Sequence, residues 1–196
     1  MIIVGEWDYQ YRRGDLQLIP YSPNCGVYKE DVLLALHKRL KEEDLWDTLF
    51  HEDGGVSLLG FMNFFSTNRT LLQILSVVKE DGTTDLAGMA WVSELCKCGG
   101  VLSRGEISFL FFRDYQSPSF TDRFGDMILE FWFEILGLDV VMGITPEPNR
   151  PARIYVKRVG GTECGRIPNW TTFKGNVVAG VITSITKEDY RKNAGR

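Results

Sequence analysis

The stretch Asn149-Arg150-Pro151-Ala152-Arg153-Ile154-Tyr155-Val156-Lys157-Arg158-Val159-Gly160-Gly161 decides the fold class. It follows an apolar run over 139–146 that predicts a strand, and a break between Pro146 and Pro148 separates the two. Asn149 can cap a helix, and Pro151 fits its first turn because a missing N–H costs nothing there. Gly160-Gly161 is a helix stop. The stretch therefore predicts a short basic helix directly after a strand.

Hydrophobic periodicity on either side predicts alternating helices and strands. The helix over 120–136 links two strands that we expect to be parallel neighbours, whereas the others pair antiparallel. The predicted helices cover 30–50, 58–65 and 120–136, and the predicted strands cover 1–11, 16–21, 70–79, 86–95, 101–113, 139–145, 162–173 and 177–185. In the helix over 120–136 the apolar stripe consists of Phe124, Ile128, Phe131, Trp132 and Ile135.

The composition is that of one ordinary globular domain. With 196 residues and 44% apolar content we expect a single domain over 1–196, with residues 1–15 as an N-terminal extra strand or extension. The net charge of -4 argues against nucleic acid as the main ligand, although the 149–161 stretch is locally basic. No apolar run approaches the roughly 20 residues of a membrane span, and the N-terminus is no signal peptide. We therefore predict a cytoplasmic protein without a membrane partner.

The cysteines and histidines suggest no metal site. Four cysteines are too few for a secreted disulfide framework in a chain of this length. A four-cysteine zinc site is the alternative to reduced, partly buried thiols, but paired C-x-x-C knuckles are absent. His37 and His51 lack a Cys or carboxylate at metal-site or triad spacing, which favours structural or surface roles.

The element order, together with the 149–161 helix, resembles the GNAT superfamily of acyl-CoA-dependent N-acetyltransferases. The short form of this pattern in the present sequence is most similar to the GNAT-like proteins of tailed phages. In the family a helix after the fifth strand begins near an Asn and ends in Gly-Phe or Gly-Gly, as Asn149 and Gly160-Gly161 do here. The resemblance covers residues 16–190. It implies an α+β, GNAT-like fold, with a mixed, mostly antiparallel sheet and helices on both faces.

The resemblance implies acetyl-CoA as co-substrate, held where the strands over 101–113 and 139–145 splay apart. Its pantetheine would pair with the backbone of Phe111, Phe112 and Arg113. The family's pyrophosphate loop, Arg/Gln-x-x-Gly-x-Gly/Ala, lacks both wrapping glycines here, and Gly125 comes too late. Anion contacts are instead expected from Ser117, Ser119, Thr121 and Arg123 at a helix N-terminus. The alternative is that Ser117 or Ser119 only caps the helix, with Asp122 completing a capping box.

Two residues are catalytic candidates by the same resemblance. Glu106 matches the position of a general base, which takes a proton from an ammonium so that the free amine can attack a thioester; the alternative is a solvated strand-end glutamate. Tyr155 is the candidate general acid for the departing thiolate. The family's tyrosine position falls one residue later, on Val156, so Tyr155 could instead face the core. Asn149 could contact the cofactor or only cap its helix.

The aromatic residues Phe61, Phe64 and Phe65 are expected either to line an acceptor pocket or to be plain core. The leading hypothesis is an N-acetyltransferase that passes an acyl group to a small-molecule or protein amine by direct attack; a homodimer is compatible with it. The alternative is a catalytically inactive GNAT fold used as a binding or phage virion-associated module, with Phe112, Tyr115 or Trp132 plugging the strand gap. A larger acyl donor is a third hypothesis.

Overall fold

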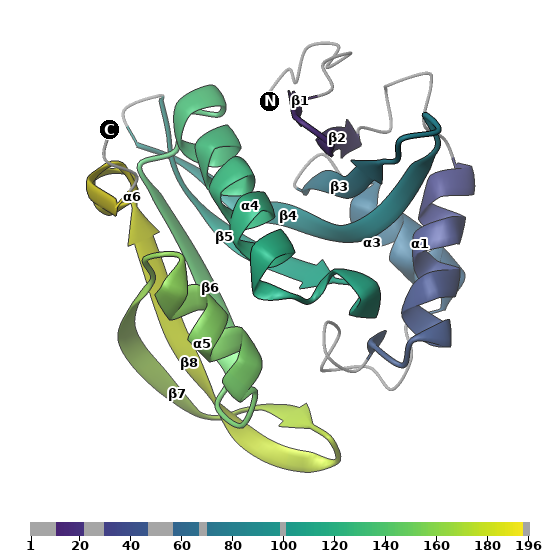
Figure 1. Ribbon diagram of the computed structural model, residues 1–196. Helices are drawn as coiled ribbons and strands as arrows, with labels where there is room; N and C mark the ends of the chain where they lie inside the picture. Colours follow the sequence, from purple (N-terminus) through teal and green to yellow (C-terminus); the bar gives the residue numbers. More distant parts are fainter. Residues whose placement is uncertain (1–10, 22–29, 47–56, 67–69, 99–100, 194–196) are drawn as a thin grey trace.

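The protein folds around one twisted sheet (Figure 1). The computed structural model describes residues 11–21, 30–46, 57–66, 70–98 and 101–193. The strands are β1 (Tyr11–Arg13), β2 (Leu16–Tyr21), β3 (Leu71–Val78), β4 (Thr84–Cys98), β5 (Val101–Phe111), β6 (Val140–Pro146), β7 (Thr162–Phe173) and β8 (Asn176–Thr186). Their order is β1-β2-β3-β4-β5-β6-β8-β7. In these residues β5 and β6 are parallel and the other neighbouring pairs are antiparallel, as predicted.

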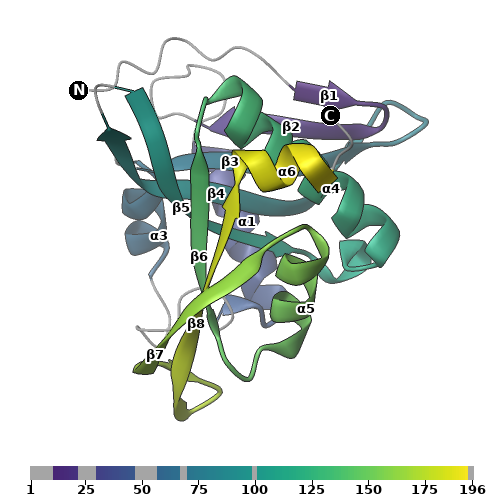
Figure 2. The same ribbon diagram turned by 90° about the vertical axis from the view of Figure 1, so that its left-hand side faces the viewer.

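Helices cover both faces of the sheet, which confirms the predicted architecture. The helical segments are α1 (Glu30–Glu42), α3 (Leu58–Phe65), the 3-10 turn η1 (Arg113–Tyr115), α4 (Pro118–Glu130), the π-helical turn η2 (Phe131–Ile135), α5 (Arg150–Arg158) and α6 (Lys187–Asn193). Figure 2 shows α1 and α3 on one face and α4, α5 and α6 on the other. The crossover between the parallel strands β5 and β6 is made by α4.

One apolar layer lies on each face. Leu36 of α1 and Phe61 of α3 are fully buried on one face, and Phe124 of α4 is fully buried on the other. The predicted stripe of α4 is buried up to Trp132, but Ile135 is 43% exposed. The α-helical period ends at Phe131, where the π-helical turn begins, so the side chain of Ile135 is rotated off the stripe.

Several predicted boundaries are corrected. The helix predicted over 30–50 ends at Glu42, because Asp44 has φ 52°, a left-handed conformation that interrupts an α-helix. The strand predicted over 101–113 ends at Phe111, where η1 follows. Of the strand predicted over 1–11, residues 1–10 lie outside the described residues, as do 47–50 of the first helix.

The N-terminal hairpin of β1 and β2 extends the sheet beside α4. Its Arg13 forms ion pairs with Asp126 and Glu130 of α4. Asp15 in the turn pairs with Arg123, also on α4. The hairpin is therefore fixed to α4 by charge as well as by its strand pairing with β3.

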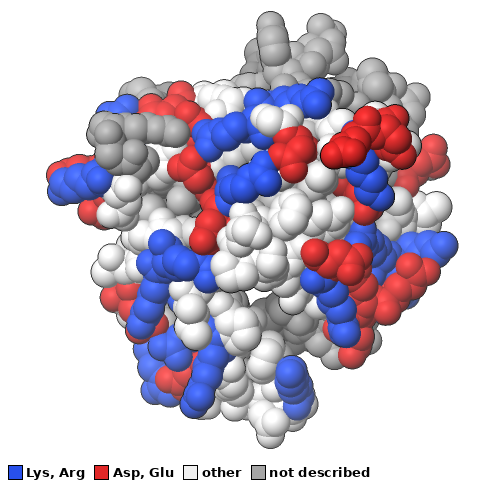
Figure 3. Space-filling model, in the orientation of Figure 1, with Lys and Arg blue, Asp and Glu red and all other residues white. Residues whose placement is uncertain are grey.

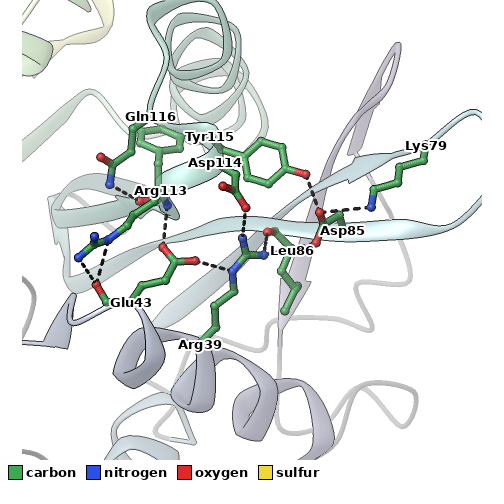
Figure 4. Close-up of polar contacts among 10 residues, drawn as sticks. Arg39, Glu43, Lys79, Asp85, Leu86, Arg113, Asp114, Tyr115 and Gln116 are labelled. Carbon is green, nitrogen blue, oxygen red and sulfur yellow. Dashed lines mark hydrogen bonds and ion pairs between the residues drawn. The ribbon is translucent and has the colours of Figure 1, made fainter.

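A polar network fixes η1 to α1 and β4 (Figure 4). Arg39 of α1 pairs with Glu43 at 2.8 Å and with Asp85 and Asp114 at 3.3 Å each. The Tyr115 hydroxyl donates a hydrogen bond to Asp85 Oδ2 at 2.8 Å. Because η1 precedes α4, this network also sets where the N-terminus of α4 lies.

Candidate acyl-CoA site

The sheet opens between β5 and β6. Their parallel register covers only Arg104–Val140, Gly105–Val141 and Glu106–Met142. Beyond that point β6 continues to pair with β8 as far as Pro146, while β5 continues to pair with β4. Figure 1 shows the two strands diverging toward α5. The expected V-shaped opening is therefore present in the described sheet.

Two adjacent spaces occupy the opening. A groove of about 470 Å³ lies between the last residues of β5, the first turn of α4 and α5. A cavity of about 130 Å³ lies beside it, in the split between β5 and β6. Phe109, Asn149, Ala152 and Tyr155 line both spaces. Figure 3 shows the face of the molecule hollowed beside α5.

Of the predicted backbone contacts, only Phe111 lies in the groove. Its carbonyl oxygen already accepts a hydrogen bond from Gln116 Nε2 at 3.0 Å. Phe112 is fully buried on the other face of the sheet, under the Arg39 guanidinium, and its N–H donates to the Ala87 carbonyl. The Arg113 N–H donates to Glu43 Oε2 at 2.7 Å. The expectation for Phe112 and Arg113 is therefore corrected: both face away from the groove.

The start of α4 differs from the predicted cap. Ser117 is the N-cap residue, but its side chain makes no capping hydrogen bond and instead lies 3.1 Å from the Ser119 hydroxyl. Asp122 pairs with Arg158 at 2.6 Å, so it does not complete a capping box. Of the four predicted anion contacts only Thr121 lines the groove. Arg123 is turned away from it to pair with Asp15.

Arg158 is the cation that the groove presents at this helix end. Its guanidinium donates to Thr121 Oγ1 at 2.9 Å and neutralises Asp122, whose charge would otherwise repel an anion. Arg150 lines the same groove at the start of α5. The sequence placed both residues in a basic stretch, but only the packing of α5 on α4 brings Arg158 to the first turn of α4. Arg158 lies three residues after Tyr155, on the same face of the helix, and this spacing could have indicated from the sequence that Arg158 belongs to the site.

Tyr155 fills the space between α5, β5 and α4. Its ring packs edge-on against Phe109 at 4.9 Å and against Phe111 at 5.6 Å between centroids. Its hydroxyl donates to the Thr121 carbonyl at 2.9 Å. Burial, and to a lesser extent the charge of Asp122, raises the pKa of Tyr155 well above its ordinary value. A Cβ at Gly125 would collide with this hydroxyl, which explains the glycine in the middle of α4.

Glu106 lies at the point where β5 and β6 part. Glu106 pairs with Ser93 of β4. Two residues further along, Ser108 pairs with Trp91, and the Trp91 ring packs against Phe65 of α3. Because alternate residues share a face, Glu106 lies on the α3 face, opposite to Tyr155. Partial burial, and then the nearby charge of Glu94, raises the pKa of the Glu106 carboxyl.

The remaining candidates fall into structural roles. Asn149 caps α5 through a hydrogen bond from the Ala152 N–H to its Oδ1 at 3.4 Å, and it also lines the groove. Phe61 and Phe65 are fully buried core, whereas Phe64 is 38% exposed. His37 is buried and packs edge-on against Phe61.

The suggested plugs do not close the opening. Phe112 lies on the far face, and Tyr115 is held by Asp85. Trp132 lines the cavity, and its indole N–H donates to Gln73 Oε1 at 3.1 Å.

Metal and membrane features were sought in the described ranges. In residues 11–21, 30–46, 57–66, 70–98 and 101–193 no group of three or more His, Cys, Asp or Glu side chains is arranged to hold a metal ion. Cys96 is partly buried and Cys164 is exposed. His51 and Cys25 lie outside those ranges. No helix in the described part of the chain is both long and apolar enough to cross a membrane.

Comparison with solved structures identifies the fold. No protein-family model and no curated protein matches the sequence. The chain is similar to spermidine N-acetyltransferase from Vibrio cholerae, solved in complex with CoA and spermine, with TM-score 0.74, 14% identity and coverage of 91% of this chain and 99% of that one. It is also similar to Mycobacterium smegmatis RimJ in complex with CoA-disulfide, with TM-score 0.70, 16% identity and coverage of 92% and 90%.

A third similar structure is the ribosomal-protein-S5-alanine acetyltransferase from Vibrio fischeri, with TM-score 0.71, 11% identity and coverage of 93% and 99%. The acetyltransferase (GNAT family) from Bacillus anthracis matches with TM-score 0.66, 14% identity and coverage of 92% and 99%. Identities this low speak to the fold alone. The protein therefore has the GNAT fold, α+β with a mixed, mostly antiparallel sheet.

Proposed function

We propose that this protein is an acyl-CoA-dependent N-acyltransferase that passes an acyl group to an amine by direct attack. The observation that carries the proposal is the end of β5–β6 pairing at Glu106–Met142, with a groove and a cavity in the opening beyond it. A thioester arm is thin enough to lie between two diverging strands. The similar structures solved with CoA or CoA-disulfide support acetyl-CoA or a related thioester as the donor.

The anionic end of the cofactor would lie at the first turn of α4. A helix N-terminus attracts anions through its dipole and its unpaired N–H groups. Here the two wrapping glycines are missing, and Arg158 beside Thr121 cancels the repulsion by Asp122 and offers guanidinium N–H donors in their place. Arg150 would contribute from the start of α5. Among the predicted anion contacts, Thr121 keeps this role because it alone lines the groove.

The chemistry would use both faces of the sheet. An amine on the α3 face would give up a proton to Glu106, and its nitrogen would then attack the thioester carbonyl in the opening. The C–S bond breaks, the nitrogen keeps the acyl group, and the thiolate takes up a proton. Tyr155 is the candidate donor of that proton, and to act it must release its hydrogen bond to the Thr121 carbonyl.

A second function, a catalytically inactive binding module, is favoured by the state of Tyr155. Its hydroxyl is engaged by Thr121, and its raised pKa makes proton transfer to a thiolate, whose ordinary pKa is about 8.5, unfavourable. The Phe111 carbonyl is engaged as well. In this version the groove binds a CoA-like ligand without turnover. The similarity to GNAT-like proteins of tailed phages, suggested by the sequence, stays a prediction.

Calorimetry and turnover together test the two functions. Titration with CoA and acetyl-CoA should give a saturable heat, and the absence of heat at millimolar ligand would remove both functions. Release of free thiol is then measured with spermidine and with a peptide that begins with alanine, because similar structures are named for these acceptor classes. Turnover lost in Glu106→Gln supports the enzyme. Binding without turnover supports the module.

A further inference from the structure

The cavity in the split is larger than an acetyl group requires. It begins beside Phe109 and Tyr155 and ends at the buried side chains of Ile128, Trp132 and Ile185. Its volume is about 130 Å³. An engineered protein cavity of roughly 150 Å³ binds benzene, whereas an acetyl group would place only its methyl group beyond the carbonyl.

Two glycines contribute to the lining of this space. Gly125 and Gly143 both line the cavity. A Cβ at Gly125 would collide with the Tyr155 hydroxyl, and a Cβ at Gly143 would lie 3.2 Å from the Ile107 carbonyl oxygen. Both positions therefore hold glycine because of their neighbours.

The inner wall is held in place. Trp132 lies in the π-helical turn η2, a kind of irregularity that is frequent at functional sites. Its indole N–H donates to the fully buried Gln73 at 3.1 Å. In the described residues Gln73 Nε2 has no hydrogen-bond partner, and a buried amide left partly unsatisfied is unfavourable. Gln73 therefore orients the ring that closes the cavity at the expense of some stability.

We propose that this cavity is an acyl-chain pocket, and that the preferred donor carries an apolar acyl group of roughly four to six carbon atoms. The proposal rests on the proposed function, because it needs a CoA thioester in the groove. Among the described residues the lining contains no charged side chain, so a carboxylate-bearing acyl group such as succinyl has no cation to pair with.

The wild-type protein tests this directly. Dissociation constants are measured by calorimetry for CoA and for its acetyl, propionyl, butyryl, hexanoyl, dodecanoyl and succinyl thioesters. Affinity should rise about fourfold with each added methylene until the cavity is full, and then fall. Succinyl-CoA should bind no more tightly than CoA.

Two results would overturn the inference, and they are distinguishable. If CoA binds but affinity is flat or falls beyond acetyl, the cavity holds the pantetheine arm and only the acyl-chain pocket is refuted. If no thioester and no CoA binds, the proposed function itself is refuted.

Variants give a second, independent test, in which the measured quantity is the acyl-chain length that binds most tightly (the acyl-length optimum). Ile128→Ala should move the optimum to longer chains, and Val156→Phe should move it to shorter ones. Ile74→Ala and Val177→Phe make the same substitutions away from the cavity, at a buried and an exposed position, and should leave it unchanged. An unchanged optimum in folded Ile128→Ala and Val156→Phe contradicts the proposal. If both fail to fold, the wild-type series still decides.

Discussion

Gly125→Ala is the sharpest test of how α5 is set against α4. The new methyl group would collide with the Tyr155 hydroxyl oxygen, and it would lie 3.1 Å from Val159 Cγ1. Moving the hydroxyl breaks its buried hydrogen bond to Thr121. Crowding costs about 1–3 kcal/mol and the unmade buried hydrogen bond about 1–3 kcal/mol, against a gain of about 1 kcal/mol from the helix preference of Ala over Gly. We expect a net loss of about 3 kcal/mol.

A double-mutant cycle isolates the cause. Tyr155→Phe removes the hydroxyl, so it should cost about 1 kcal/mol by itself. In that background Gly125→Ala should cost no more than about 1 kcal/mol, because only the contacts with Val159 and the ring remain. The expected coupling energy is thus about 2 kcal/mol, from urea unfolding with matched m-values. Additivity within about 0.5 kcal/mol would refute the assigned collision.

Substitutions at Glu106, Arg158 and Arg39 test three other parts of the structure. Because the pKa of Glu106 is raised, activity should rise as the pH rises through that pKa. Over the same pH range the free energy of unfolding of the wild type should fall relative to that of Glu106→Gln. Identical pH profiles of unfolding for the two proteins would contradict this. Arg158→Ala should weaken CoA binding about tenfold at low salt and less at high salt. Arg166→Ala, outside the groove, is its control in calorimetry. Arg39→Ala should cost about 2 kcal/mol in urea unfolding, because three carboxylates lose their common partner. The exposed Lys38→Ala should cost less than about 0.5 kcal/mol, and equal losses would exclude the network.

Local patterns predicted most of the elements. The helix over 150–158 and its Asn149 cap follow from residues that are close in sequence, so capping rules suffice. The first helix was predicted too long, because the left-handed conformation of Asp44 leaves no clear mark in an otherwise helical pattern. The π-helical turn at Phe131 was missed for the same reason, since its sequence still reads as an apolar helix.

The site was predicted less well than the fold. Thr121, Asn149 and Phe111 lie in the groove, but Phe112 and Arg123 face other partners. Sequence spacing assigns a strand residue to one of two faces only if the register is known. The partner of an exposed arginine depends on which element packs beside it. Arg123 is drawn to the N-terminal hairpin, an element that the sequence could not place.

The sequence by itself determined the element order and the basic helix that lines the opening, because both depend on short-range propensity and periodicity, whereas the α+β class was implied by the resemblance. Only the tertiary structure decided where β5 leaves β6, since no residue pattern marks the end of a strand pair at Glu106–Met142. It also decided that Arg158 neutralises Asp122 and that Gly125 admits the Tyr155 hydroxyl. These contacts join residues more than 20 positions apart, and their geometry is set by how two helices pack on one sheet.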